Sequence, residues 1–292
     1  MLVGFVGLGI MGRPMALNLI KGGHKLRVHG CRAESMLPLE QAGATTCASA
    51  AEAARGCDAI VTMVADTPDV EQVIFGGLGV AEGAAPGSVV VDMSTISPVA
   101  TRSMAVRLAN MGIEMLDAPV SGGDVDAISG TLSIMVGGSA AVFVMMRPLL
   151  ELMGKTVTYI GANGAGQVAK ACNQIVVAVT LESVAEALTL ARRNAVDPGK
   201  VRAALLGGFA WSKVLEVHGR RIVERDFKPG FKAKLHHKDL RIVTETAAQL
   251  GIALPQSALI AQHLNALVGM GCGDEDSAAV TKVLETLSGL KL

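Results

Sequence analysis

A helical stretch in the middle of the chain carries three polar side chains whose types and spacing suit acid–base chemistry. Lys170, Asn173 and Gln174 lie within Gly166–Val179, which turns apolar within two helical turns. Residues three and four positions apart share a helix face, so the amine and both amides form one stripe. A partly buried amine there has a lowered pKa and can donate a proton to a developing oxyanion. A solvated stripe or an ordinary salt-bridge lysine is the structural alternative.

A glycine-rich turn close to the N-terminus indicates binding of a dinucleotide. The segment 7–12 fits G-x-G-x-x-G, follows the predicted strand Leu2–Val6 directly and opens a helix. Its first glycine permits a tight turn, the second lets the backbone approach a diphosphate, and the third allows close helix–strand packing. The helix N-terminal N–H groups then bind the diphosphate. The predicted contacts are Gly7, Leu8, Gly9, Ile10, Met11 and Gly12, and a glycine-rich turn without a ligand is the alternative.

The end of the second predicted strand favours one form of the dinucleotide. That strand ends His29-Gly-Cys-Arg32, without the carboxylate that usually binds the adenine-ribose hydroxyls. Arg32 can instead meet a 2′-phosphate as a charge-assisted donor. Cys31 and Arg32 are therefore predicted cofactor residues, and NADP(H) is favoured while NAD(H) stays possible. A solvated loop arginine is the alternative for Arg32.

Further polar loops follow other predicted strands. Val64-Ala-Asp-Thr-Pro68 and Met93–Pro98 each follow a strand, so both are expected at the carboxyl edge, where doubly wound sheets bind ligands. Ser121-Gly122-Gly123 offers a hydroxyl and unobstructed N–H groups, which suit a carboxylate, although such a segment is elsewhere often only a turn.

These residues are expected on two kinds of element. Alternation of short apolar runs with helical patterns predicts an α/β, Rossmann-like, doubly wound and mainly parallel sheet, followed by an all-α C-terminal domain. The expected domains are residues 1–162, for the dinucleotide, and 163–292, for substrate and dimerisation, entered by a long interdomain helix from Gly166 to about Asn194. The expected strands are Leu2–Val6, Leu26–His29, Ala59–Val64, Ser88–Met93, Glu114–Leu116, Leu132–Val136 and Val157–Ile160. The expected helices of the first part are Met11–Lys21, Glu34–Ala42, Ala50–Gly56, Asp69–Phe75 and Pro98–Asn110. Later helices are expected near Pro198, Ser212, His237 and Pro255, and at Ser277–Leu287, with a mobile loop at 269–276.

Composition excludes several classes of partner. The 26 basic and 26 acidic residues cancel, and six Phe, one Tyr and one Trp leave little for base stacking, so nucleic acid is not expected. Five scattered cysteines form no CxxC pair, and His236-His237 has no third ligand at metal spacing, so no metal is expected. The apolar run Ile175–Leu181 is too short for a bilayer and the start of the chain reads as a strand, so no membrane partner and a cytoplasmic location are expected.

The chain resembles the β-hydroxyacid dehydrogenase family over nearly its whole length. The family's cofactor motif is similar to residues 7–19, its substrate motif to Asp117–Gly123 continued by Gly130–Gly138, its catalytic motif to Gly166–Gln174, and its second cofactor motif to Lys238-Asp-Leu240. The four motifs stand in the family's order and spacing.

The resemblance implies roles for individual residues. It implies that Lys170 is the general acid/base, and that Val64, Ala65 and Thr95 contact the cofactor ribose and nicotinamide. It further implies that Lys238 reaches the cofactor and that the protein is a homodimer or homotetramer. The substrate-binding residues expected are Ser121, Gly122, Gly123, Asn173 and Gln174.

Within the family, residues 207–219 and Phe227–Lys232 look most like members that reduce tartronate semialdehyde to glycerate. The substrate implied is thus a small aldehyde acid and the product a hydroxy acid. Trp211 departs from the small residue typical of that position, which leaves 3-hydroxyisobutyrate, glyoxylate and succinic semialdehyde open as alternatives. Imine reductases share the scaffold but usually lack the lysine. A non-catalytic dinucleotide sensor is the alternative from another class.

Overall fold

A computed structural model describes residues 1–290, and the chain divides into two compact units, Met1–Lys170 and Ala171–Leu292. Unit 1 contains all the strands, and unit 2 is helical within its described residues. The domain boundary expected at residue 162 stays a prediction.

Unit 1 is built on one nine-stranded sheet with the strand order β3-β2-β1-β4-β5-β6-β8-β7, and β9 pairs with β8. The first six positions have the strand order of dinucleotide-binding sheets. Pairing is parallel except between β8 and its neighbours β6 and β7. The strands are β1 (Leu2–Val6), β2 (Lys25–His29), β3 (Thr45–Thr46), β4 (Ala59–Thr62), β5 (Val89–Asp92), β6 (Glu114–Asp117), β7 (Val120–Ser121), β8 (Ser133–Gly137) and β9 (Thr156–Gly161).

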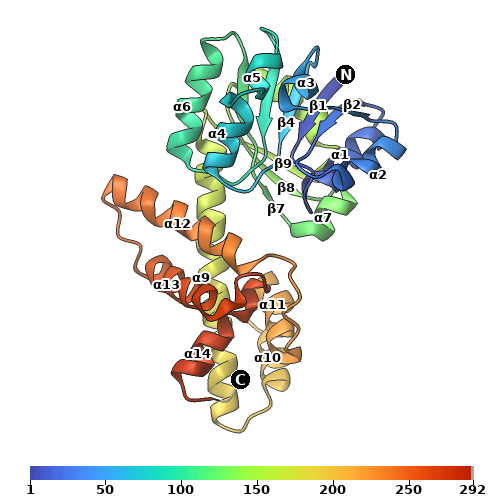
Figure 1. Ribbon diagram of the computed structural model, residues 1–292. Coiled ribbons are helices and arrows are strands. Elements are labelled where there is room, and N and C mark those ends of the chain that lie inside the picture. Colours follow the sequence, from blue (N-terminus) through green and yellow to red (C-terminus); the bar gives the residue numbers. More distant parts are fainter. Residues whose placement is uncertain (291–292) are drawn as a thin grey trace. The chain divides into compact units, whose positions relative to one another are not determined.

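Helices cover both faces of this sheet (Figure 1). Central strands are therefore apolar on both sides: Val89 and Val91 join one core with Met15, while Val90 joins another with Met104. The predicted α/β, doubly wound, mainly parallel fold is thus confirmed. The helices of unit 1 are α1 (Gly12–Lys21), α2 (Ala33–Gln41), α3 (Ala50–Ala54), α4 (Thr67–Phe75), α5 (Val80–Gly83), α6 (Pro98–Ala109), α7 (Gly123–Ser129) and α8 (Ala140–Leu150).

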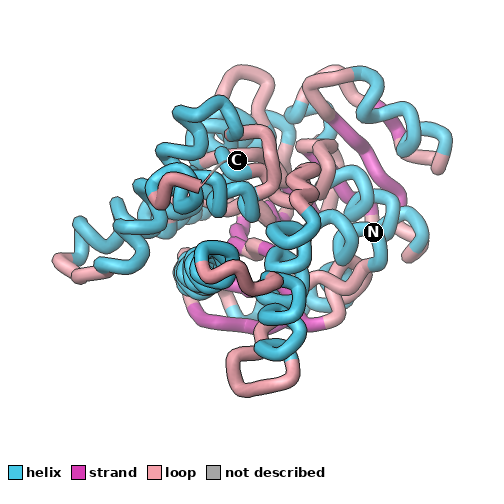
Figure 2. Tube along the Cα trace, turned by 90° about the horizontal axis from the view of Figure 1, so that it is seen from below, coloured by secondary structure: helices cyan, strands magenta, loops and turns pink. Residues whose placement is uncertain are grey.

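Unit 2 packs its helices around a third core. The helix α9 (Ala165–Arg193) begins in unit 1 and contributes Leu181, Ala185 and Leu188 to this core; it is yellow in Figure 1 and viewed end-on in Figure 2. The other elements are α10 (Pro198–Leu206), α11 (Lys213–Glu224), α12 (Ala233–Leu250), α13 (Pro255–Leu267), η1 (Val268–Cys272), η2 (Ser277–Val280) and α14 (Thr281–Leu287). By length and composition α9 could cross a membrane, but half of its most apolar stretch is buried within the protein, as in a core helix.

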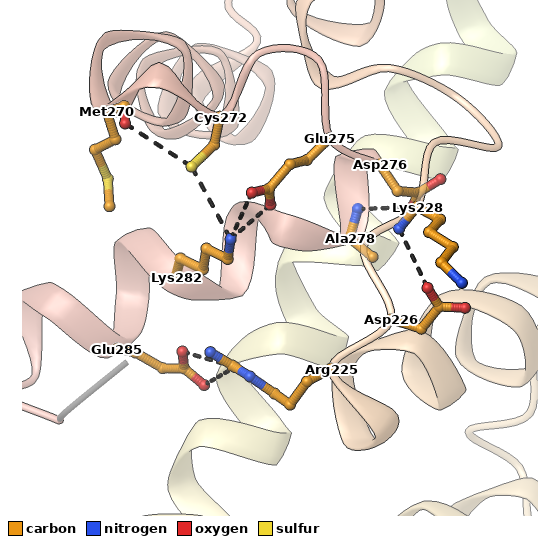
Figure 3. A network of polar contacts seen from close by, with 10 residues as sticks. All are labelled: Arg225, Asp226, Lys228, Met270, Cys272, Glu275, Asp276, Ala278, Lys282 and Glu285. Carbon is orange, nitrogen blue, oxygen red and sulfur yellow. Dashed lines mark hydrogen bonds and ion pairs between the residues drawn. The ribbon is translucent and has the colours of Figure 1, made fainter.

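Charged side chains connect the last elements of unit 2 (Figure 3). Glu285 accepts hydrogen bonds from Arg225 at 2.7 and 2.9 Å, and Glu275 pairs with Lys282. Buried Asp276 accepts from the N–H of Ala278 at 3.0 Å. Burial acts to raise the pKa of Asp276, but His218 and backbone N–H donors outweigh it and hold the pKa at about 2.

Sequence patterns missed several of the short elements, although they predicted α3. The strands β3 and β7 have two residues each, and the helices α5 and α7 are only one or two turns long, which is too short for a clear periodicity. The longer α8 was also missed. The segment 269–276, expected as a loop, begins within η1, where Gly271 interrupts the helical backbone with φ +81° and ψ +6°, and Asp276 at its end is anchored as described above.

Candidate active site

The turn between β1 and α1 has the space and the backbone donors that a diphosphate needs. Gly7 has φ +96°, and a Cβ there would lie 2.2 Å from the carbonyl oxygen of Met63. A Cβ on Gly12 would lie 1.9 Å from the oxygen of Gly7, whereas one on Gly9 would meet no atom within 4 Å. No side chain caps α1, and its first turn has no acidic residue. The turn therefore fits an anionic dinucleotide, which would lie over Gly9.

The other residues predicted to contact the cofactor lie at the same edge of the sheet, within unit 1. Cys31 and Arg32 follow β2 and are exposed, Val64 and Ala65 follow β4, and Thr95 follows β5. Because β1 pairs in parallel with β2 and β4, and β4 with β5, the carboxyl ends of these strands are neighbours. Within the turn, Leu8 is buried in the core, Met11 packs against it, and Ile10 is largely exposed.

A hydrogen-bond network holds the loops after β4 and β5 together. Asp92 accepts from the Thr62 hydroxyl at 2.8 Å and from the Ser94 N–H at 3.2 Å, and the Ser94 hydroxyl accepts from the Val64 N–H at 2.9 Å. Complete burial raises the pKa of Asp92 to about 6, although the hydrogen bonds from Ser94 and Thr62 oppose the shift. The predicted cofactor contacts Val64 and Thr95 thus adjoin a shared polar anchor.

The start of α9 is fastened to the end of β6 by a buried carboxylate. Asp117 accepts from the N–H of Gly164 at 2.8 Å and of Gln167 at 3.0 Å. Burial raises the pKa of Asp117, and these N–H donors oppose the shift. Glycines allow the close approach, since a Cβ on Gly166 would lie 2.4 Å from the oxygen of Met135. The position of the helix that carries Lys170 is therefore set from the sheet edge.

A second contact ties the same helical turn to the loop after β5. The Gln167 side chain, 1% exposed, donates to the oxygen of Ser94 at 2.8 Å and accepts from the N–H of Ile96 at 3.1 Å. Lys170, itself buried, follows three residues later on α9. Gln167 therefore links the segment around Thr95 to the first turns of the helix of Lys170.

The predicted carboxylate-binding segment forms the junction of β7 and α7. Gly122 and Gly123 have φ of +139° and +75°, so glycine is required at both positions, and both are exposed. The α7 helix is held against α1 by a 2.8 Å hydrogen bond from Asn18 to the oxygen of Ala127. A cavity of about 250 Å³ between these helices is lined by Ile10, Arg13, Pro14, Leu17, Asn18, Asp124 and Ile128.

In unit 2, two predicted substrate residues belong to a chain of polar contacts. The Asn173 amide donates to Gln174 Oε1 at 2.7 Å, and Gln174 Nε2 donates to Asp239 Oδ2 at 2.6 Å. The Lys238 ammonium lies 2.7 Å from Asp239 Oδ1. Asn173 is half-buried, whereas Gln174 and Asp239 are buried. The chain thus joins the beginning of α9 to α12.

Two family models together match almost the whole chain. The NAD binding domain of 6-phosphogluconate dehydrogenase matches residues 2–161, and the NAD-binding domain of NADP-dependent 3-hydroxyisobutyrate dehydrogenase matches residues 164–284. The 2-hydroxy-3-oxopropionate reductase of Escherichia coli K12 is 46% identical over 294 residues, covering 100% of both chains. The 2-(hydroxymethyl)glutarate dehydrogenase of Eubacterium barkeri is 36% identical, covering 99% of this chain and 97% of its own. The chain belongs to the 3-hydroxyisobutyrate dehydrogenase family.

A solved structure of this family shares the fold over the full length. The crystal structure of 3-hydroxyisobutyrate dehydrogenase from Salmonella typhimurium superposes with a TM-score of 0.88 at 33% identity, covering 97% of this chain and 99% of the other. As a member of the 3-hydroxyisobutyrate dehydrogenase family, the protein is an NAD(P)-dependent oxidoreductase acting on CH–OH groups. Its cofactor is a nicotinamide dinucleotide, as the glycine-rich turn predicts.

Several residues of this family member's site escaped the sequence analysis as individual positions. Asp92, Asp117 and Gln167 are buried and hydrogen-bonded to loops or helices that carry predicted site residues. The feature of the sequence that could have identified them is the presence of polar residues at the ends of apolar strands and on an apolar helix. His236, which was not expected to bind a metal, is buried against the ring of Phe231. Residues 1–290 contain no cluster of three or more potential metal ligands.

Proposed function

We propose that the protein reduces tartronate semialdehyde (2-hydroxy-3-oxopropanoate) to D-glycerate. The observation that carries this substrate is the 46% identity over the full length to a 2-hydroxy-3-oxopropionate reductase. Identity to the 3-hydroxyisobutyrate dehydrogenase of Pseudomonas aeruginosa is lower, 34% over 264 residues. A small aldehyde acid also suits the hydroxyl and N–H groups of Ser121, Gly122 and Gly123, which we propose bind its carboxylate.

Lys170 is the proposed general acid. When bound, the reduced nicotinamide supplies the hydride that the carbonyl carbon receives, and the carbonyl oxygen gains negative charge. The ammonium of Lys170 stabilises that charge and transfers a proton to the oxygen. In the reverse direction the neutral amine accepts the hydroxyl proton. Support comes from the burial of Lys170 and from the two anchors of its helix, Asp117 and Gln167.

NADP(H) is the proposed form of the cofactor, with NAD(H) as the alternative. Arg32 is exposed at the start of α2, where a 2′-phosphate would approach from the end of β2. Val64, Ala65 and Thr95 are proposed contacts of the ribose and nicotinamide. The predicted contact of Lys238 with the cofactor and the cytoplasmic location stay predictions.

Steady-state turnover of purified protein tests the substrate. We expect kcat/KM for tartronate semialdehyde to exceed that for 3-hydroxyisobutyrate, glyoxylate and succinic semialdehyde. A kcat/KM at least tenfold higher for any of these three compounds would overturn the proposed substrate. The assignment of the protein as an oxidoreductase of this family would not change.

Lys170→Ala tests the proposed acid. Turnover should fall at least ~100-fold, the scale of lost general acid catalysis, while NADPH binding measured by fluorescence is retained. Lys200→Ala, at an exposed position of α10, is the matched control and should behave as the parent protein. Unchanged turnover in Lys170→Ala would refute the role of this lysine. Absence of turnover in the parent protein, with NADPH still bound, would instead favour a non-catalytic dinucleotide sensor.

A homodimer is the smallest assembly we propose. Val176 and Leu190 on α9 are about two-thirds exposed within one chain, which leaves apolar surface for a second copy. Light scattering coupled to size-exclusion chromatography distinguishes a homodimer from a homotetramer. A measured mass of 30.0 kDa, that of a single chain, would contradict the proposed dimer.

A further inference from the structure

The polar chain of unit 2 places one amide, that of Gln174, between the carboxylate of Asp239 and the amide of Asn173, which is predicted to bind the substrate. Asp239 accepts from Gln174, which in turn accepts from Asn173, with both distances below 2.8 Å. Gln174 is 4% exposed and Asp239 is 4% exposed, so water competes little for these bonds. Gln174 and Asp239 are 65 positions apart in the sequence.

The carboxylate determines the direction of every hydrogen bond in this chain. An ionised carboxylate only accepts, so the amide of Gln174 must turn its Nε2 toward Asp239. Its Oε1 then faces Asn173, which must turn its own Nδ2 toward Gln174. The amide of Asn173 consequently keeps its carbonyl oxygen, Oδ1, for another partner. The ammonium of Lys238 forms an ion pair with the other oxygen of Asp239 at 2.7 Å.

We propose that Gln174 and Asp239 are positioning residues that fix the amide of Asn173 with its oxygen presented as an acceptor. The group that this oxygen recognises is a hydrogen-bond donor, which in a hydroxy acid or a hydroxylated aldehyde acid is a hydroxyl group. Gln174 then acts through Asn173 and does not touch the substrate. This inference rests on the proposed function for the identity of the ligand, but the orientation of the amide is independent of it.

Nuclear magnetic resonance of protein labelled with 15N at asparagine tests the orientation without any assay of activity. The side-chain signal of Asn173 is the one missing in Asn173→Ala. In Gln174→Leu this signal should shift and exchange with water at least ~10-fold faster, because its acceptor is lost. The matched control is Gln249→Leu, at an exposed position of α12. An unchanged Asn173 signal in Gln174→Leu would overturn the proposal, whatever the substrate is.

A double-mutant cycle tests whether the positioning matters for the reaction. With the best substrate of the panel, Asn173→Ala and Gln174→Leu should each lower kcat/KM at least ~10-fold. The double variant should match Asn173→Ala alone within about twofold, because Gln174 has no second route to the substrate. Losses that multiply would mean that Gln174 acts independently of Asn173, which contradicts the proposal.

Gln174→Glu supplies a readout that simple loss of packing does not reproduce. A protonated glutamic acid can donate to Asp239 and accept from Asn173, as glutamine does, but the ionised form cannot donate. The charged groups that face this position are Asp239, its partner Lys238, and Lys170, one turn earlier on the same face of α9. Relative to the parent protein, kcat/KM of Gln174→Glu should fall by ~10-fold or more between about pH 5.5 and about pH 8.5. A constant ratio across that range would contradict the proposed direction of the bonds.

Lack of turnover of all substrates by the parent protein would refute the proposed function alone, since the amide signal of Asn173 still reports the orientation of its side chain.

Discussion

Replacing Asp92 by asparagine should make the protein more stable at neutral pH. Asp92 ends β5, is completely buried, and accepts hydrogen bonds from Thr62 and Ser94 through Oδ1. Its second oxygen has no hydrogen-bond partner among residues 1–290. Asparagine keeps the shape and the accepting oxygen while removing a charge from a site that solvates it poorly.

The pKa of Asp92 sets the size and the sign of the effect. Burial raises this pKa from 3.8 to about 6, so between these values the folded state binds more protons than the unfolded state. The free energy of unfolding therefore falls as the pH rises through this window, and the loss is complete above about pH 6. At 1.36 kcal/mol for each pKa unit, the charge costs about 3 kcal/mol at neutral pH. This is the upper limit of the gain, because the amide nitrogen is as poorly bonded as the oxygen it replaces.

Thermal unfolding followed by circular dichroism between about pH 4 and about pH 8 checks this prediction. Asp92→Asn should have the higher Tm above about pH 6, by several degrees, and a smaller decrease from pH 4 to pH 6. The Tm of Asp92→Asn should still decrease somewhat as the pH rises, because burial also raises the pKa of Asp117. The control is Asp274→Asn: the pKa of that exposed carboxylate is held at about 2 by Lys232 and Lys234, so its contribution is lost as the pH falls. An unchanged slope in Asp92→Asn, or a lower Tm at pH 7, would refute the reasoning.

Two further substitutions test the cofactor preference and the anchoring of α9. Arg32→Ala should raise the KM for NADPH ~10-fold or more and leave that for NADH unchanged, since only the 2′-phosphate loses a charged donor; an unchanged ratio of the two would contradict this role. Gln167→Leu should lower kcat ~10-fold and the free energy of unfolding by about 1–3 kcal/mol, because the buried Ser94 oxygen and Ile96 N–H lose their partner. Gln249→Leu is its control, and wild-type kinetics in Gln167→Leu would show that this contact does not position the site.

Local patterns were sufficient to predict the main elements of the fold. The glycine-rich turn, the apolar strands and the long helix depend on residues near one another in sequence, and the structure bounds β1 and α9 within one residue of the prediction. Strand ends also predicted which loops would become neighbours, because parallel strands end at one edge. Elements with a weak or short periodicity, such as β3 and α7, could not be predicted in this way.

The sequence by itself determined the class of fold, the dinucleotide turn and the stripe of Lys170, Asn173 and Gln174, since each depends on short-range backbone geometry and side-chain periodicity. Only the tertiary structure decided how that stripe is held. Asp117 reaches Gly164 across 47 positions, and Asp239 reaches Gln174 across 65. Such bonds form because buried polar groups must find partners within the folded chain, and no local pattern states which partner lies within reach.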